Sequence, residues 1–455
     1  MGADTIAAVS TPLASGGLGV VRISGPEALS CGDKIFRPYG NRKLSSLGGY
    51  QAAYGEVFGA DGVIDECVAL VFRAPRSYTR EDVVELSCHG GVYVMRAVLR
   101  AALAAGARLA QPGEFTRRAF LNGRIDLTRA EAVMEIISAR GELAAKAAQS
   151  QREGAMFKKA QELKRVLVDI SADISAFVDF PDEDVPGLEP DVLRGKLTNI
   201  SQALGRCADS YGRGKILREG VPTVIAGRPN VGKSTLMNLI SGAERSIVTS
   251  VPGTTRDLVE ESVTFGDAVL VLTDTAGLRE AGDEVEKIGV ARAKDRIASA
   301  QLVFAVFDAS RCLTDDDEKL IAETDTSRTV AVLNKCDLCE KIDEEYINSK
   351  YKHTVKLSAK NGEGLDELEN AVRELLGTAR IDPGEPMAAS ERQLENIRAA
   401  KDGADAALEA LDEGMTLDAV STGVEQATRE IMKLTGESAS QEVIDRVFEK
   451  FCVGK

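Results

Sequence analysis

The chain of 455 residues is too long for one ordinary hydrophobic core, and its length predicts about three domains. Its formal net charge of −15 repels a polyanion such as RNA, so an RNA substrate would require a local basic patch or a basic partner. With only two His, the chain disfavours a Ser-His-Asp triad and a histidine-rich metal site. No apolar run reaches the roughly 18 residues of a membrane span, and no basic leader opens the chain. We therefore expect a cytoplasmic protein with reduced cysteines and no membrane association.

Residues 1–118 alternate short apolar runs with turn residues and predict a compact α+β domain. Strands are expected at 19–25, 67–75 and 82–91, each closed by Gly or Pro. A helix is expected at 91–107, where Gly106 provides the stop signal.

Two stretches of the chain carry apolar residues at helical spacing. They are residues 119–217, with helices expected within 129–151 and 158–180, and residues 379–455, which end in the tail "CVGK". Because the termini of a domain often lie close together, we expect the two stretches to form one helical domain that carries the intervening residues as an insertion.

The intervening residues 218–378 predict a doubly covered, mainly parallel α/β domain. Buried strands, separated by helical patterns, are expected at 221–227, 268–277, 302–310, 329–337 and 354–359. The predicted fold class is therefore multidomain α/β: an N-terminal α+β domain, an α-helical domain and an inserted α/β domain.

The stretch "GRPNVGKS", residues 227–234, matches a P-loop between a predicted strand and a predicted helix. Its glycines let backbone N–H groups surround phosphate oxygens, Lys233 would reach the β- and γ-phosphates, and Ser234 would bind Mg²⁺. The remaining nucleotide-binding residues expected in and after the loop are Gly227, Asn230, Val231, Gly232, Thr235 and Thr249.

Four further motifs follow in the order expected of a GTPase with a Ras-like P-loop domain. "GTTRD" offers Thr255 as a second Mg²⁺ ligand, and "DTAG" offers Asp274 and Gly277 near the γ-phosphate. In "NKCD", the Asp337 carboxylate can accept both N–H donors of guanine, which adenine lacks, and this selects GTP over ATP. The other expected guanine-site residues are Asn334, Lys335, Ser358 and Ala359.

Leu278 stands where Ras-like proteins have a water-orienting Gln, so another group must orient the attacking water. The nearby carboxylates Glu280, Asp283, Glu284 and Glu286 are the candidates. The CxxC spacing of Cys336 and Cys339 lies inside the guanine loop without a second pair, so we interpret it as fortuitous.

The terminal "FCVGK" does not fit a prenylation box, because Gly454 and Lys455 occupy its last two places. Two hypotheses remain for Cys452: a reactive thiol, or a small hydrophobic residue that packs under the last helix beside Phe451 and Val453.

The sequence resembles the tRNA modification GTPase family called MnmE or TrmE from end to end. The motifs that carry the resemblance are "DTIAAVSTP", "VRISG", "EDVVELSCHGG", "QPGEF", "AFLNGRIDL", "VDFPDED", "VIAGRPNVGKST", "VTSVPGTTRD", "DTAGLRE" and "FCVGK". The resemblance implies a homodimer with an N-terminal domain that binds 5,10-methylene- or 5-formyl-tetrahydrofolate. It also implies an FAD-dependent MnmG-type partner in a heterotetramer, which would hold most of the tRNA. Together the two proteins would add a (carboxymethyl)aminomethyl group to C5 of the wobble uridine.

The resemblance further implies roles for individual residues. A K⁺ ion between facing G domains would be bound by Asn230, Thr249, Val251 and Thr254, and Glu286 would position water as the catalytic residue. The folate site would consist of Arg22, Glu85, Arg124 and Lys455, with Cys452 as a second catalytic residue. Relatives often have Lys at the Arg124 place, which keeps the charge and changes its geometry.

Two other functions are compatible with a G domain in this setting. A ribosome-assembly GTPase switch would need a basic RNA-binding domain, which the acidic composition does not favour. A folate enzyme that the G domain merely regulates is the other alternative.

Overall fold

The computed structural model describes residues 4–179, 188–243, 260–273, 297–378 and 381–454. The chain forms two compact units. One comprises residues 1–134, 156–205 and 391–455, and the other comprises residues 135–155 and 206–390. Among the described helices, none is both long and apolar enough to cross a bilayer.

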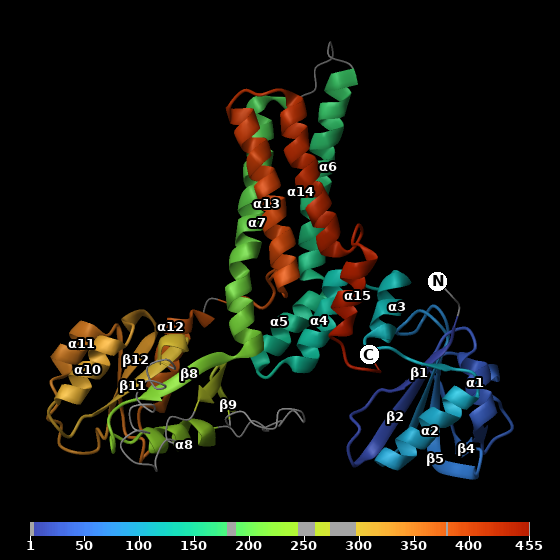
Figure 1. The fold of residues 1–455 in the computed structure, drawn as a ribbon, viewed down its shortest axis with the longest axis horizontal. Coiled ribbons are helices and arrows are strands. Elements are labelled where there is room, and N and C mark those ends of the chain that lie inside the picture. The colour runs from blue at the N-terminus through green and yellow to red at the C-terminus, as the bar shows by residue number, and fades with distance from the viewer. Residues whose placement is uncertain (1–3, 180–187, 244–259, 274–296, 379–380, 455) are drawn as a thin grey trace, which may run out of the picture. The chain divides into compact units, whose positions relative to one another are not determined.

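The first unit begins with a seven-stranded sheet of order β3-β4-β5-β6-β2-β1-β7 (Figure 1). The strands are β1 (Ile6–Val9), β2 (Gly16–Ser24), β3 (Phe36–Pro38), β4 (Gln51–Gly59), β5 (Gly62–Phe72), β6 (Val83–Gly90) and β7 (Arg108–Leu109). Helices α1 (Ala28–Ile35) and α2 (Val92–Ala104) cover one face of the sheet and close a hydrophobic core against it.

Strand β2 shows how the sheet positions a functional side chain. Successive side chains of a strand point to opposite faces. Val21 and Ile23 are fully buried in the core beneath the two helices. Arg22, between them, is therefore directed to the opposite face, where it lies beside Glu85 of the neighbouring strand β6.

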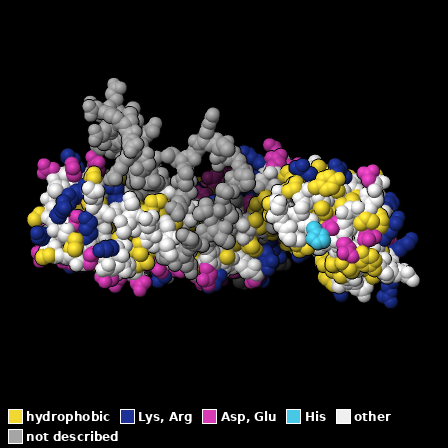
Figure 2. Space-filling view, turned by 90° about the horizontal axis from the view of Figure 1, so that it is seen from below, with side chains coloured by type: hydrophobic (Ala, Val, Ile, Leu, Met, Phe, Trp, Pro, Cys, Tyr) yellow, Lys and Arg dark blue, Asp and Glu magenta, His cyan; other side chains and the backbone are white. Residues whose placement is uncertain are grey.

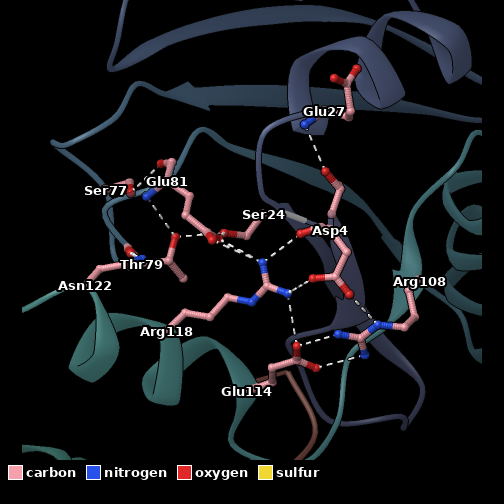
Figure 3. Close-up of polar contacts among 11 residues, drawn as sticks. Asp4, Ser24, Glu27, Ser77, Thr79, Glu81, Arg108, Glu114, Arg118 and Asn122 are labelled. Carbon is pink, nitrogen blue, oxygen red and sulfur yellow. Dashed lines mark hydrogen bonds and ion pairs between the residues drawn. The ribbon is translucent and has the colours of Figure 1, made fainter. Parts of the chain in front are cut away.

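Helix α3 (Glu114–Leu121) is attached to the sheet by a cluster of charges (Figure 3). Arg118 donates to Asp4 at 2.7 Å, to Glu114 at 3.0 Å and to Glu81 at 3.1 Å. Arg108 donates to the same Asp4 and Glu114 carboxylates, at 2.7 and 2.6 Å. Burial alone would raise the pKa of Asp4 and Glu114, but the two guanidinium groups hold both pKa values below their usual range. The cluster therefore stays ionised at neutral pH.

The helices of the first unit pack through apolar stripes and small residues. They are α6 (Ala155–Asp179), the first part of α7 (Pro190–Glu219), α13 (Glu391–Asp412), α14 (Leu417–Thr435) and α15 (Gln441–Glu449). Helices α13 and α14 lie side by side along their length (Figure 1). A Cβ at Gly403 would lie 2.8 Å from the Ala427 nitrogen, and one at Gly423 would lie 2.6 Å from the Gly403 oxygen. Only glycine permits this backbone approach.

The second unit contains a six-stranded sheet of order β13-β12-β11-β8-β10-β9. Its strands are β8 (Val221–Ala226), β9 (Glu260–Phe265), β10 (Ala268–Thr273), β11 (Leu302–Asp308), β12 (Thr329–Asn334) and β13 (His353–Leu357). All neighbours are parallel except β9 and β10. Its helices include α8 (Lys233–Ala243), α10 (Asp315–Glu323), α11 (Glu344–Lys350) and α12 (Leu365–Leu376).

The predicted fold class is confirmed, since an α+β sheet domain, long helices and a mainly parallel α/β domain all occur. The apolar run at 129–151 is interrupted, however: α4 (Leu127–Ser138) ends before Gly141 and α5 (Glu142–Glu153) begins after it. The antiparallel edge strand β9 was not predicted, because its sequence "EESVTF" lacks a buried-strand pattern. The predicted domain boundaries at 118, 217 and 378 stay predictions.

Replacing Arg118 with Met is expected to destabilise the N-terminal sheet domain by about 3 kcal/mol, because it removes the ion pair of Glu81 and one of the two guanidinium groups that pair with the buried Glu114 carboxylate. A multidomain chain has no single unfolding transition, so hydrogen exchange of the β1 and β2 amides is the suitable measurement. We expect exchange roughly 100-fold faster than in the unchanged protein. Arg96→Ala on the exposed side of α2 is the control, and equal exchange in both variants would contradict the prediction.

Candidate functional site

The P-loop connects β8 to α8 at the carboxyl end of the parallel sheet, where α/β proteins bind ligands. Its backbone adopts positive φ at Gly227 (153°), Asn230 (64°) and Gly232 (103°). The Lys233 ammonium donates to the carbonyls of Gly227 at 2.6 Å and Arg228 at 2.9 Å, which joins the two arms of the loop. Val231 is buried under the loop, whereas Ser234 and Thr235 are exposed in the first turn of α8.

Asn334 connects three segments of the nucleotide site. This residue ends β12 and is 2 % exposed. Its amide nitrogen donates to the Val231 carbonyl at 2.7 Å, and its amide oxygen accepts from the Ala359 backbone at 3.0 Å. A Cβ on Gly232 would lie only 2.2 Å from the same amide nitrogen. The P-loop and the loop after β13 are therefore held at fixed distances from one asparagine.

Lys335 provides the second connection, from a backbone with φ of 68°. Its ammonium donates to the Asn230 carbonyl at 2.8 Å and to the Asp308 carboxylate at 2.7 Å. Burial alone would raise the pKa of Asp308, but the Lys335 ammonium and the donors of Ser310 hold it below its usual range. Sequence analysis missed Asp308; its position at the end of a buried parallel strand was the available signal.

Asp337 follows on the same loop and is exposed. Ser358, which is buried, donates its hydroxyl to Asp337 Oδ1 at 2.7 Å. One carboxylate oxygen is thereby oriented, and the exposed carboxylate keeps acceptor capacity for ligand donors. Within the described part of the chain, the structure thus brings together three segments in which guanine- and phosphate-binding residues were predicted: the P-loop, residues 334–337 and residues 358–359.

Several predicted residues lie outside the described residues: Thr249, Val251, Thr254, Thr255, Asp274, Gly277, Glu286 and Lys455, together with Leu278. Their roles stay predictions. Both cysteines of the CxxC pair are described, and for Cys336 burial followed by the charges of Glu363 and Asp337 raises the pKa of the thiol. A raised pKa disfavours a reactive thiolate, in line with the interpretation of this spacing as fortuitous.

A second candidate site lies on the face of the N-terminal sheet opposite α1 and α2, where α3 and the C-terminal tail pack. Arg22 Nε donates to Glu85 at 2.7 Å, and the side chains of this pair are 20 % and 22 % exposed. A second Arg22 nitrogen donates to the carbonyl of Gly454 at 3.2 Å, and the Ser10 hydroxyl donates to the same carbonyl at 3.1 Å. Gly454 of the C-terminal tail therefore lies beside this ion pair.

The tail is fixed by backbone as well as side chains. The Gly113 nitrogen donates to the Cys452 carbonyl at 3.3 Å, and Phe451 is buried against Phe448. Gly454 has φ of 96°, and a Cβ there would lie 2.2 Å from the Val9 oxygen. Cys452 itself is exposed. The hypothesis that it packs as a buried small hydrophobic residue is therefore wrong, because the tail turns its side chain to solvent.

Tyr78 links Arg124 to Arg22. The Arg124 guanidinium lies 4.7 Å from the Tyr78 ring centroid and donates to the Tyr78 carbonyl at 2.8 Å. The Arg22 guanidinium lies 5.8 Å from that ring and 5.5 Å from the Phe115 ring. Three of the four residues predicted for a folate site are thus linked through Arg22 and Tyr78. Sequence analysis missed Tyr78 and Phe115, because nothing in their spacing relates them to Arg22.

The arrangement offers both chemistries that a reduced folate requires of a protein. Guanidinium groups match carboxylates, and Glu85 can accept from N–H donors of a pterin. Both partners of the Arg22–Glu85 pair are accessible to a ligand. The residues present therefore fit such a cofactor.

Comparisons with known proteins cover the whole chain. The model of the MnmE helical domain matches residues 127–452, and that of the GTP-binding protein TrmE N-terminus matches residues 5–124. The tRNA modification GTPase MnmE of Acetivibrio thermocellus is 39% identical, and that of Carboxydothermus hydrogenoformans is 40% identical, each over 99% of both chains.

Among solved structures, the G domain of the T. maritima FeoB iron transporter is 25% identical and covers 34% of this chain and 96% of its own, with a TM-score of 0.25. Aquifex aeolicus Era bound to GDP·AlF4⁻ is 25% identical and covers 40% and 65%, with a TM-score of 0.27. Scores this low carry no weight for the fold, whereas the full-length identities above do. The chain belongs to the family of tRNA modification GTPases named MnmE.

Proposed function

We propose that this GTPase depends on K⁺ and acts with an FAD-dependent MnmG-type partner to add a (carboxymethyl)aminomethyl group to C5 of the wobble uridine of certain tRNAs. A one-carbon tetrahydrofolate supplies the carbon. The observation that carries the proposal is the position of the C-terminal tail. The Gly454 carbonyl accepts a hydrogen bond from Arg22, and Cys452, two residues earlier in the chain, is exposed. The tail thereby joins the segment that carries this thiol to the Arg22–Glu85 ion pair.

Three described features support GTP as the substrate. The Asp337 carboxylate is exposed and oriented by Ser358. Asn334 holds the P-loop against the guanine loop, and Lys335 lies between the P-loop and Asp308. Ser234 at the start of α8 and Thr255 are proposed as the Mg²⁺ ligands, and Asp274 and Gly277 as residues near the γ-phosphate.

K⁺ is proposed to bind Asn230, Thr249, Val251 and Thr254. Of these, Asn230 is described: it is exposed in the P-loop, and its amide oxygen is a hard donor of the kind that binds alkali cations. The ion would neutralise charge that develops between phosphates, as an arginine does in other GTPases. Glu286 is proposed to position water, because Leu278 cannot.

The folate is proposed to bind at Arg22, Glu85, Arg124 and Lys455. Here Arg22 and Arg124 would bind carboxylate or pterin acceptors, and Glu85 would accept pterin N–H groups. Cys452 is proposed as the catalytic thiol of this site. The arrangement supports folate binding. The presence of such a site in a GTPase favours tRNA modification chemistry over a ribosome-assembly switch.

A homodimer through the N-terminal domain is supported by apolar side chains on the face of its sheet opposite α1 and α2. Tyr54 pairs with Val68 across β4 and β5, and Tyr39 meets Tyr54 edge-on at 5.3 Å. Tyr39, Tyr54 and Val68 are 58%, 54% and 42% exposed. Figure 2 shows hydrophobic side chains gathered on this domain. Exposed apolar surface of this kind marks protein interfaces.

The tRNA is proposed to be held mainly by the MnmG-type partner in a heterotetramer, because a chain of net charge −15 repels a polyanion on average. The cytoplasm is the proposed location, as the compartment in which tRNA is modified.

Asp337→Asn is expected to weaken GTP binding about 100-fold and to favour XTP, because an amide donates where the carboxylate accepted and xanthine carries a carbonyl in place of the amino group. Competition binding with the two nucleotides measures the change. Cys339→Ser on the same exposed loop is the control. Unchanged preference for GTP would remove Asp337 from the guanine site.

GTP hydrolysis is expected to be at least about tenfold faster in KCl than in NaCl at equal ionic strength. Asn230→Gly retains the positive φ and removes the amide oxygen, so we expect it to abolish the difference between the salts. Asn238→Ala, exposed on α8, is the matched control. Equal rates of the unchanged protein in both salts would refute K⁺ dependence.

Cys452→Ser is expected to abolish wobble-uridine modification while GTP hydrolysis stays within about twofold, since a hydroxyl is a far weaker nucleophile than a thiolate. Mass spectrometry of tRNA nucleosides from a deletion strain carrying each variant measures this. Val453→Ala, exposed beside it, is the control. Full modification by the Cys452→Ser variant would leave the thiol no chemical role, and full modification in the deletion strain would favour the ribosome-assembly alternative.

A further inference from the structure

A pocket of about 520 Å³ lies in the N-terminal domain and is not accounted for by the Arg22–Glu85 pair. Its walls combine guanidinium groups and aromatic rings; the main lining residues are Arg76, Arg80, Arg124, Tyr50, Phe72 and Tyr78. No lining residue is Asp or Glu. The volume lies in the range of pockets that bind small molecules.

The three arginines keep most of their donor capacity. Arg80 donates to the Asn122 carbonyl at 2.9 Å, and Arg124 donates to the Tyr78 carbonyl at 2.8 Å. Within the described parts of the chain, no carboxylate lies in ion-pair distance of any of the three. Each guanidinium carries five N–H donors, so several remain for a ligand. Three adjacent cations without counter-ions in an acidic protein indicate an anionic ligand.

Backbone strain marks the same pocket independently. Of the described residues other than glycine, four have positive φ: Tyr50, Arg80, Asn230 and Lys335. Asn230 and Lys335 belong to the nucleotide site, and Tyr50 (64°) and Arg80 (62°) both line this pocket. Side chains other than Gly, Asn and Asp are disfavoured in this conformation, and such strain concentrates at ligand sites. Among the described residues, positive φ at residues other than glycine thus occurs in this pocket and in the nucleotide site, and nowhere else.

The pocket adjoins the proposed folate site. Tyr78 and Arg124 line it, and Tyr78 also lies 5.8 Å from the Arg22 guanidinium. The loop that carries Tyr78 and Arg80 is held in place by the Arg118 cluster, since Glu81 accepts from Arg118 and the Thr79 carbonyl accepts from Asn122 (Figure 3). One ligand can therefore occupy both places if it has a ring system at one end and repeated carboxylates at the other.

We propose that this pocket binds the oligo-γ-glutamyl tail of the folate, so that the protein prefers polyglutamylated over monoglutamylated cofactor; the inference rests on the proposed folate function. Each added glutamyl unit contributes one carboxylate, and guanidinium forks match carboxylates in geometry as well as charge. The rings of Tyr50, Phe72 and Tyr78 provide apolar surface for the methylene groups between them.

Single-stranded RNA is the competing occupant, because arginines and aromatic rings also bind unstacked bases. The geometry favours the oligocarboxylate, since RNA sites extend along a groove of basic residues and this one is a pocket of small-molecule size.

The test measures binding of 5-formyl-tetrahydrofolate with one, three and five glutamyl residues to the full chain by calorimetry. We expect the pentaglutamate to bind roughly tenfold more tightly than the monoglutamate near 50 mM salt, and the advantage to shrink at 0.5 M salt. In Arg76→Ala and Arg80→Gly, the ratio of the two affinities is expected to fall toward one. Arg80→Gly accommodates the positive φ, and Arg96→Ala removes an exposed charge of the same domain as the control.

The outcomes separate the inference from the function on which it rests. If no folate form binds, the proposed folate use is overturned and the inference with it. If mono- and pentaglutamate bind the unchanged protein equally, only the inference is overturned. Equal loss of preference in Arg96→Ala overturns it too, because the effect would then be one of overall charge. An anticodon stem-loop RNA that loses binding in Arg76→Ala, without any effect of tail length, assigns the pocket to RNA.

Discussion

The guanidinium of Arg22 holds the two ends of the chain together. It lies on β2, pairs with Glu85 on β6 and donates to the carbonyl of Gly454 in the tail. Around it the backbone of Gly113 donates to Cys452, and Gly454 lies so close to Val9 that no side chain could be accommodated. These contacts fix residues 452–454 against the N-terminal sheet domain within the first unit.

The charge cluster of Arg118 stabilises the domain in which that contact lies. Arg118 and Arg108 neutralise Asp4, Glu81 and Glu114, which lie on three separate segments (Figure 3). Removal of either arginine would take away one of the two counter-ions of the buried Glu114 carboxylate, so the members of the cluster depend on one another. The cluster fixes the loop of Tyr78 and the start of α3. Because Arg124 donates to the Tyr78 carbonyl, the cluster also helps to position Arg124.

The nucleotide site is held together by one neutral and one charged side chain. Asn334 and Lys335 are consecutive residues, yet they bond to the P-loop, to the end of β11 and to the loop after β13. The amide of Asn334 is buried and both of its ends are bonded, so its geometry is rigid. Lys335 gains its position from a positive φ, which directs its side chain back over the loop. Strain at this residue and at Asn230 is thus part of how the site is assembled.

Much of the fold could be predicted from local patterns. Buried apolar runs gave five strands of the parallel sheet, because such strands are apolar on both faces and bounded by turns. Strands β1, β3, β4 and β7 and the edge strand β9 escaped prediction, since their pairing partners rather than their own sequences make them strands. The interruption at Gly141 escaped as well, because the apolar spacing on its two sides continues the same period.

The sequence by itself determined the chemistry of the nucleotide site and the family, because P-loop and guanine motifs are contiguous and their function requires those residues at that spacing. Only the tertiary structure decided which side chains surround Arg22, that Cys452 faces solvent, and that Arg76, Arg80 and Arg124 share a pocket with Tyr50 and Tyr78. The segments that carry these residues lie far apart in the chain, and no local rule links the segments. The physical reason is that these contacts depend on which strands pair in the sheet and on where the C-terminal tail packs. A local sequence pattern encodes neither.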